Sequence, residues 1–167
     1  RYVDDGIEII TINSDLEDTK RRCFVGQDNY AGGCVAGGLM GEIIPDGGKV
    51  MIISGSADNT ATVKRTKGFI AELSYHYPSI KILEPRFAYD DNWVAGKLLE
   101  VQLEITPDLK GIYMPAQGEI GVCKILKKYE LEKKIKLIVH DYEGENKKNL
   151  KEGVIDFVLR QDAYAVS

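Results

Sequence analysis

Polar residues stand at the end of every apolar run that this sequence predicts as a strand. The run IKLIV (135–139) ends in HD (140–141), and a bare carboxylate at the end of a core strand is costly unless it has a partner. The other runs end in NSD (13–15), SGSADN (54–59), RFAYD (86–90), MPAQG (114–118) and RQD (160–162). Carboxylates and amides exchange hydrogen bonds with hydroxyl groups, and aromatic rings cover the C–H face of a sugar. The set predicts a site for a neutral, polyhydroxylated ligand.

Turn and cap chemistry is the competing explanation for some of these residues, because strand-to-helix loops carry such side chains in any α/β protein. It explains the following positions at least as well: Ser54, Asp58, Asn59 and Asp90. A ligand role is favoured for Asp141 and Gln161, each of which ends an apolar strand abruptly. Arg65, just inside a predicted helix, can reach the same rim. Tyr89 fits a pocket lining and a half-buried ring equally well.

Catalytic and metal-binding patterns are missing from the sequence. His140 and Asp141 are adjacent on a predicted strand, so they point to opposite faces and do not form a base–carboxylate pair. There is no GxSxG, HExxH, GxGxxG or GxxxxGK[ST] motif, and Cys23, Cys34 and Cys123 form no CxxC pair. The stretch SGSADNT (54–60) resembles a phosphate-binding helix start only faintly. The sequence therefore predicts a non-enzymatic protein without a metal or cofactor.

Apolar strands alternate with helical patterns along the chain. Strands are predicted at 7–12, 49–53, 80–84, 109–113, 135–139 and 154–159, and helices at 29–44, 59–76, 91–104, 118–129 and 143–151. The first helix should face inward with Ala31, Val35, Leu39 and Ile43. Such alternation predicts a three-layer α/β sandwich with a mostly parallel sheet of about six strands, whose ligands bind beyond the carboxyl ends of the strands.

Composition excludes two classes of function for this stretch. The 167 residues carry a formal net charge of -4 without a long basic run, which argues against nucleic-acid binding. No apolar run approaches the ~20 residues of a membrane span. The first residues, RYVDDGIEII, are too acidic for a signal peptide and begin in mid-pattern without Met, so we expect a piece of a longer protein.

Four phrases together carry a family resemblance: VGQDNYAGGCVAGGLMGEI, GGKVMIISGSADNTATVKRTKGF, PDLKGIYMPAQGEIGVCKIL and IKLIVHDYEGENKKNLKEGVIDFVLRQD. In this order they resemble bacterial type 1 periplasmic sugar-binding proteins and the sensing domains of lactose-repressor-type transcription regulators, from about residue 7 to 163. Those proteins clamp a ligand between two flavodoxin-like lobes. The resemblance implies that residues 1–14 cross over from an N-terminal lobe, 15–160 form the C-terminal lobe, and 161–167 begin the return crossover.

Matching motif positions imply which residues touch the ligand. They are Asn13, Asn29, Arg65, Tyr89, Gln117, Asp141 and Gln161. Two of these positions lie in segments that depart from the family pattern. Asn13-Ser14 replaces the Asp-Arg pair of the pentose binders, and AQGEIG (116–121) replaces NDEMALG with one residue fewer. Because hydroxyl selectivity depends on such contacts, the departures leave the identity of the sugar open.

Three functions are compatible with these residues. The first is the sugar- or polyol-sensing module of a cytoplasmic lactose-repressor-type regulator, which would contact DNA only through a domain absent from this chain and could form a homodimer. The second is the exported receptor of a sugar transporter, located in the periplasm or outside the cell as a lipoprotein. The third is a flavodoxin-like enzyme, which turnover or a flavin at residues 54–60 would reveal. An upstream helix-turn-helix or signal peptide would separate the first two.

Overall fold

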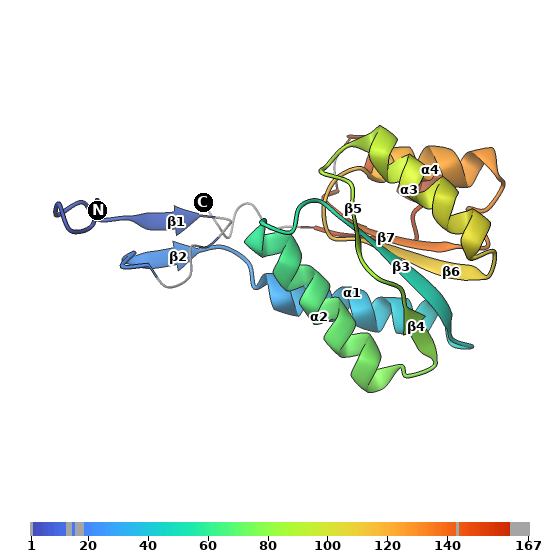
Figure 1. Ribbon diagram of the computed structural model, residues 1–167, viewed down its shortest axis with the longest axis horizontal. Helices are drawn as coiled ribbons and strands as arrows, with labels where there is room; N and C mark the ends of the chain where they lie inside the picture. Colours follow the sequence, from blue (N-terminus) through green and yellow to red (C-terminus); the bar gives the residue numbers. More distant parts are fainter. Residues whose placement is uncertain (1, 13–14, 16–18, 143, 161–167) are drawn as a thin grey trace.

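The computed structural model describes residues 2–12, 15, 19–142 and 144–160. It consists of an α/β lobe and a two-stranded arm that projects from one end of the lobe (Figure 1). The lobe contains a parallel six-stranded sheet with the order β4-β3-β6-β7-β8, and β5 also pairs with β3. Its strands are β3 (Gly48–Ser54), β4 (Ile80–Ile82), β5 (Arg86–Phe87), β6 (Leu109–Met114), β7 (Lys136–His140) and β8 (Phe157–Leu159). The predicted fold class is confirmed.

Strand β5 is a short element that the sequence analysis missed. Strands β4 and β5 occupy one edge of the sheet in succession, since β4 pairs with the start of β3 and β5 with its end at Ile53 and Ser54. Pro85 stands between them, and proline cannot donate a ladder hydrogen bond. The edge strand is therefore interrupted at Pro85, and two short strands, β4 and β5, pair with β3 in place of one continuous strand.

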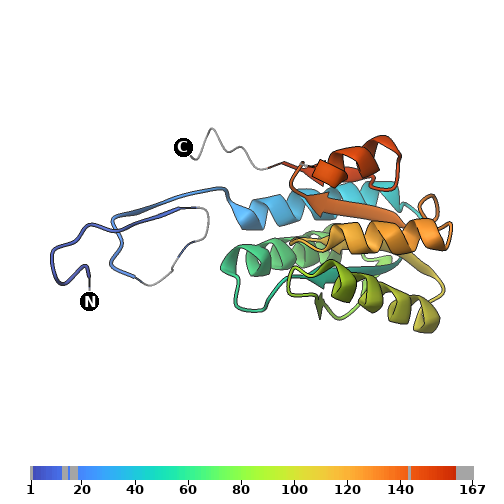
Figure 2. The same cartoon turned by 90° about the horizontal axis from the view of Figure 1, so that it is seen from above.

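Helices cover both faces of the sheet (Figures 1 and 2). They are α1 (Asn29–Ile43), α2 (Thr60–His76), α3 (Asn92–Ile105), α4 (Glu119–Lys128) and α5 (Gly144–Lys151). Because successive strand residues point to opposite faces, Val50 and Ile52 pack under α1 and α2, whereas Met51 and Ile53 pack under α3 and α4. Side-chain oxygens of Asp28, Asn59 and Asp91 cap the first three helices.

The inward face of α1 differs from the prediction. Ala31 and Val35 are exposed, and Leu39 and Ile43 only partly buried, while Gly33, Ala36, Gly37 and Met40 face inward. The reason is a close crossing with α2: a Cβ atom on Gly33 would lie 2.0 Å from the carbonyl oxygen of Arg65. The hydrophobic pattern could not reveal this contact, because small residues rather than large ones make it.

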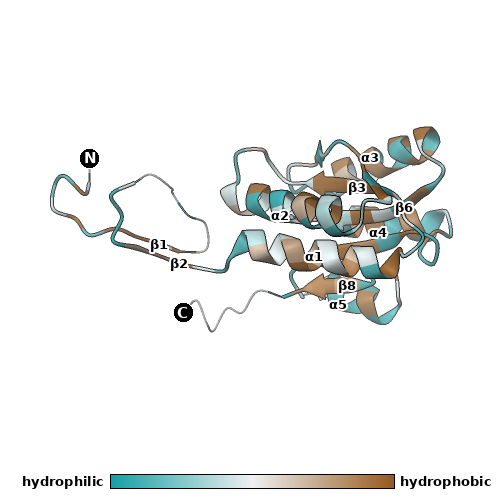
Figure 3. Ribbon diagram, turned by 90° about the horizontal axis from the view of Figure 1, so that it is seen from below, coloured by the Kyte–Doolittle hydropathy of each residue, from teal (hydrophilic) through white to brown (hydrophobic). Residues whose placement is uncertain are grey.

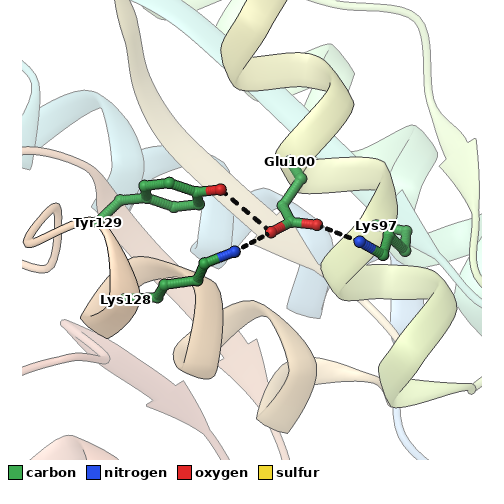
Figure 4. Close-up of polar contacts among 4 residues, drawn as sticks. All are labelled: Lys97, Glu100, Lys128 and Tyr129. Carbon is green, nitrogen blue, oxygen red and sulfur yellow. Dashed lines mark hydrogen bonds and ion pairs between the residues drawn. The ribbon is translucent and has the colours of Figure 1, made fainter.

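Helices α3 and α4 are joined by a polar cluster on their outer side (Figure 4). The carboxylate of Glu100 accepts hydrogen bonds from Lys97 Nζ at 2.6 Å, Lys128 Nζ at 2.7 Å and Tyr129 Oη at 3.2 Å. The hydrogen bonds from Lys128 and Lys97 lower the pKa of Glu100 to about 2. Both lysines are more than half exposed, and ion pairs with exposed partners contribute little to stability.

The arm consists of β1 (Ile10–Ile12) and β2 (Cys23–Val25), which pair in parallel with each other in a separate sheet. The strand predicted at 7–12 forms over Ile10–Ile12 and lies outside the six-stranded sheet, and β2 was not foreseen. Figure 3 shows the apolar character of the two strands. Ile7, Ile10 and Ile12 expose 53%, 53% and 62% of their surface. In the part of the chain that the structure describes, no helix combines the length and apolar character that a bilayer crossing requires.

Candidate ligand-binding site

The carboxyl ends of β3, β5, β6 and β7 and the first turns of α2 to α5 meet at one end of the lobe, and the arm leaves from the same end (Figure 1). Ligands of open parallel sheets bind at such an end. The predicted rim is therefore present, and its side chains can be placed one by one.

Arg65 is the central cation of this rim. Only 6% of its surface is exposed, and its Nε donates to Asn29 Oδ1 at 2.9 Å while Nη1 donates to the Pro115 carbonyl oxygen at 2.9 Å. The close α1–α2 crossing at Gly33 brings the start of α1 within reach of this side chain. Burial lowers the pKa of Arg65, and Tyr113 and the negative charge of Asp141 oppose that effect. Guanidinium remains protonated in proteins, so Arg65 is a fixed positive charge with further N–H donors.

A buried pair supports the rim from below. Tyr113 Oη and His140 Nε2 lie 2.9 Å apart, and the Tyr113 ring stacks on Phe69 with centroids 4.1 Å apart. Burial, together with the charge of Arg65, lowers the pKa of His140 to about 3. The imidazole is therefore neutral near pH 7. The role of His140 as a structural partner of Tyr113 could not be predicted from the sequence.

Asp141 follows β7 and has a left-handed backbone, with φ at 65°. Its N–H donates to the Leu159 carbonyl oxygen at 3.0 Å, and its own carbonyl oxygen accepts from Asn146 Nδ2 at 3.0 Å. The residue is partly buried, and its charge acts on Arg65. The structure thus brings Asn29, Arg65 and Asp141 together around one polar rim.

Tyr89 and Gln117 occupy the outer part of the rim. Tyr89 has φ at 54° and is 72% exposed, so the half-buried alternative is wrong. Gln117 is exposed, and its backbone N–H donates to Asp90 Oδ1 at 3.1 Å. Neither side chain reaches the buried Arg65 network through a hydrogen bond described here. The other two predicted contacts, Asn13 and Gln161, lie outside the described residues.

A hollow of about 340 Å³ separates the arm from the starts of α1 and α2. It is lined by Asp15, Phe24, Gly26, Gln27, Asp28, Asn29, Thr60, Ala61 and Lys64. Thr60 Oγ1 donates to the Asp15 carbonyl oxygen at 3.2 Å, which ties the arm to the lobe beside this hollow. Phe24 could not be predicted as a lining residue, because it lies on the three-residue strand β2, which is too short for a periodic signal.

The family of the chain follows from a match over its whole length. The model of the family described as the periplasmic binding protein domain matches residues 1–167. The chain belongs to this family. Periplasmic binding protein domains are non-catalytic, in agreement with the prediction that the chain is not an enzyme. No curated protein matches the chain in sequence.

Solved structures similar to this periplasmic binding protein domain bind sugars. A glucose-galactose binding protein from Geobacillus stearothermophilus is 26% identical, with a TM-score of 0.91 over 98% of this chain and 59% of its own. A solute-binding protein of an ABC transporter from Burkholderia graminis, in complex with D-arabinose, is 27% identical, with a TM-score of 0.89 over 98% of this chain and 60% of its own. A third, from Agrobacterium vitis and bound to α-D-tagatopyranose, is 28% identical, with a TM-score of 0.85 over 93% and 56%. The chain thus spans less than two thirds of these proteins.

Proposed function

We propose that the chain is the C-terminal lobe and hinge of a sugar receptor that serves a transporter, and that it holds a neutral sugar against Asn29, Arg65 and Asp141. The observation that carries the proposal is a buried arginine that is hydrogen-bonded to Asn29 and lies within electrostatic reach of the Asp141 carboxylate, at the carboxyl ends of the strands. Opposite charges at one rim balance each other, so the site has no excess charge to offer an anionic or cationic ligand. Sugar hydroxyls both donate and accept, and they satisfy the two groups together.

The proposed two-lobe arrangement rests on the arm and on chain length. The exposed isoleucines of β1 present an apolar surface that needs a covering partner. The three solved relatives described above are longer than this chain, which leaves room for a second lobe. A sugar that bridges two lobes would favour the closed state by its differential affinity for that state. Residues 1–14 would then be the outgoing crossover and 161–167 the beginning of the return.

A transporter receptor is the better supported of the two roles that the sequence left open. The solved relatives named above are sugar-binding proteins, and two are described as solute-binding proteins of ABC transporters. The regulator interpretation rests on the sequence resemblance alone, and the described residues contain no element that would favour it. Arabinose, tagatose, glucose and galactose are the first sugars to test, because the relatives are named for them or contain them.

The proposal is tested by calorimetry on the complete protein with these four sugars. We expect one or more to bind to the wild type, and Arg65→Ala and Asp141→Asn to lose about 2–5 kcal/mol of binding free energy each. Asp141→Asn removes the charge but tolerates the left-handed backbone, which asparagine adopts readily. Lys49→Ala is the matched control, since it removes a surface cation paired with Asp108 at the opposite end of β3. Unchanged sugar affinity in both rim variants would refute the assignment.

A further inference from the structure

Asp141 has a left-handed backbone conformation, which residues other than glycine adopt at a cost. Its φ of 65° lies in the left-handed region, which costs roughly 1–2 kcal/mol for most residues with a Cβ atom and less for Asp and Asn. A glycine would avoid this cost, yet the position carries the side chain that we assign to the sugar. Strain of this kind persists only where surrounding contacts hold the backbone in place.

Asn146 and Leu159 provide such contacts to the backbone of Asp141. Asn146, 4% exposed and in the first turn of α5, donates through Nδ2 to the carbonyl oxygens of Asp141 at 3.0 Å and His140 at 3.4 Å. The same Nδ2 lies 2.7 Å from Oε1 of Glu119, the first residue of α4. On the opposite side, the Asp141 N–H donates to the Leu159 carbonyl oxygen at 3.0 Å. The left-handed peptide is therefore held at its N–H by β8 and at its carbonyl oxygen by Asn146.

We propose that Asn146 and Glu119 are positioning residues for sugar recognition, which act through the backbone of Asp141 and do not touch the sugar. This inference rests on the proposed function of Asp141. Asn146 fixes the carbonyl oxygen of Asp141, and Glu119 orients the Asn146 amide by accepting from it. The direction of the Asp141 carboxylate toward Arg65 and the ligand is set by these contacts, before any sugar arrives.

Glu119 also joins two ligand-side loops. Gly118, with φ at 108°, connects it directly to Gln117, whose N–H is held by Asp90 at 3.1 Å. The segment 117–119 after β6 is therefore hydrogen-bonded at one end to Asp90, after β5, and at the other end to Asn146. Asn146 in turn holds Asp141, after β7. A change at Glu119 should alter how well the site distinguishes one sugar hydroxyl from another as well as the overall affinity.

Another role for Glu119 must be separated from positioning. An acidic residue in the first turn stabilises a helix through the helix dipole, and this effect needs the negative charge. Positioning needs only an acceptor for the Asn146 amide. Glu119→Gln keeps an acceptor oxygen and removes the charge, whereas Glu119→Ala removes both. The two variants therefore give different results under the two roles.

The test measures sugar affinity by calorimetry in the complete protein, with a melting temperature for each variant. We expect Asn146→Ala and Glu119→Ala each to raise Kd about tenfold, the loss expected for one buried hydrogen bond. Glu119→Gln should stay within about twofold of the wild type. Asn149→Ala is the control for Asn146, since Asn149 is equally buried on the same helix but accepts from Lys127 instead.

Two further measurements make the outcome decisive. In an Asp141→Asn background, Asn146→Ala should raise Kd less than about threefold, because neighbouring residues that act as a unit are not additive. Amide hydrogen exchange at Asp141, which needs no sugar, should become at least about tenfold faster in Asn146→Ala and stay unchanged in Asn149→Ala.

Unchanged exchange, or a Kd unchanged in Asn146→Ala, overturns the positioning role. A tenfold effect of Asn146→Ala that persists in the Asp141→Asn background also overturns it. If Asn146→Ala does not fold, the Glu119→Ala and Glu119→Gln pair decides by the same readouts. A wild type that binds none of the sugars refutes the proposed function instead, and hydrogen exchange then decides whether the pair holds Asp141.

Discussion

Protonation of His140 should make the lobe lose stability as the pH falls. The side chain is 6% exposed, and burial lowers its pKa from 6.5 to about 3 in the folded chain. The unfolded chain keeps the ordinary value. Between these two values the unfolded state binds a proton that the folded state does not, so unfolding is favoured by acid. The contribution of His140 is complete above about pH 6.5 and diminishes as the pH falls toward about 3.

The size of the effect follows from the two pKa values. Each unit of difference corresponds to about 1.4 kcal/mol, so the ceiling is on the order of 5 kcal/mol at full protonation of the unfolded state. At pH 5 the folded protein should have lost roughly 2 kcal/mol through this residue alone. His140→Gln removes the titration and keeps a hydrogen-bonding partner for Tyr113 Oη.

The assay is urea denaturation of wild type and His140→Gln at pH 8, 7, 6 and 5. We expect the free energy of unfolding of the wild type to fall about 2 kcal/mol further than that of the variant over this range. His76→Gln is the control, because the side chain of His76 is 54% exposed. Parallel pH profiles for the wild type and His140→Gln would refute the argument that burial keeps this imidazole neutral.

Three other substitutions test the packing and the rim. Gly33→Ala should cost at least about 2 kcal/mol of stability and also weaken sugar binding, since its Cβ atom would lie 2.0 Å from the Arg65 carbonyl oxygen. Gly32→Ala is the control, because a Cβ atom there would have nothing within 4 Å. Equal unfolding midpoints for the two variants would contradict the close crossing of α1 and α2. Glu100→Ala should leave sugar affinity unchanged and shift the urea unfolding midpoint only slightly; a large shift would show that this cluster contributes more than surface pairs usually do. Tyr89→Gly should raise the free energy of unfolding in urea by about 1 kcal/mol, because glycine adopts a φ of 54° without strain. The same variant should weaken sugar affinity measured by calorimetry, and unchanged affinity would remove Tyr89 from the site.

Strand and helix positions were largely predictable because periodicity and capping act locally. The five helices and the main strands lie within a few residues of their predicted ranges. Strand β2 was not predicted because three residues carry no periodic pattern, and its parallel pairing with β1 in a separate sheet was not predicted either. Pairing between distant segments is a tertiary property that local pattern does not contain.

The rim residues were predictable in type but not in their connections. Strand-end chemistry indicated Asp141 and placed Arg65 near the same rim, and the resemblance added Asn29; the structure places the three together. Neither approach indicated Asn146, because a buried asparagine in a polar helix resembles ordinary surface. Its role appears only when the left-handed backbone of Asp141 is seen beside it.

The location of the bound sugar is the most direct test of the account. A crystal structure of the complete protein with whichever of the four sugars binds most tightly would provide it. We expect sugar hydroxyls within about 3.2 Å of the Asp141 carboxylate and of an Arg65 guanidinium nitrogen, at the carboxyl ends of β3, β6 and β7. A sugar held elsewhere on the lobe, with both groups out of hydrogen-bonding reach, would contradict the central claim.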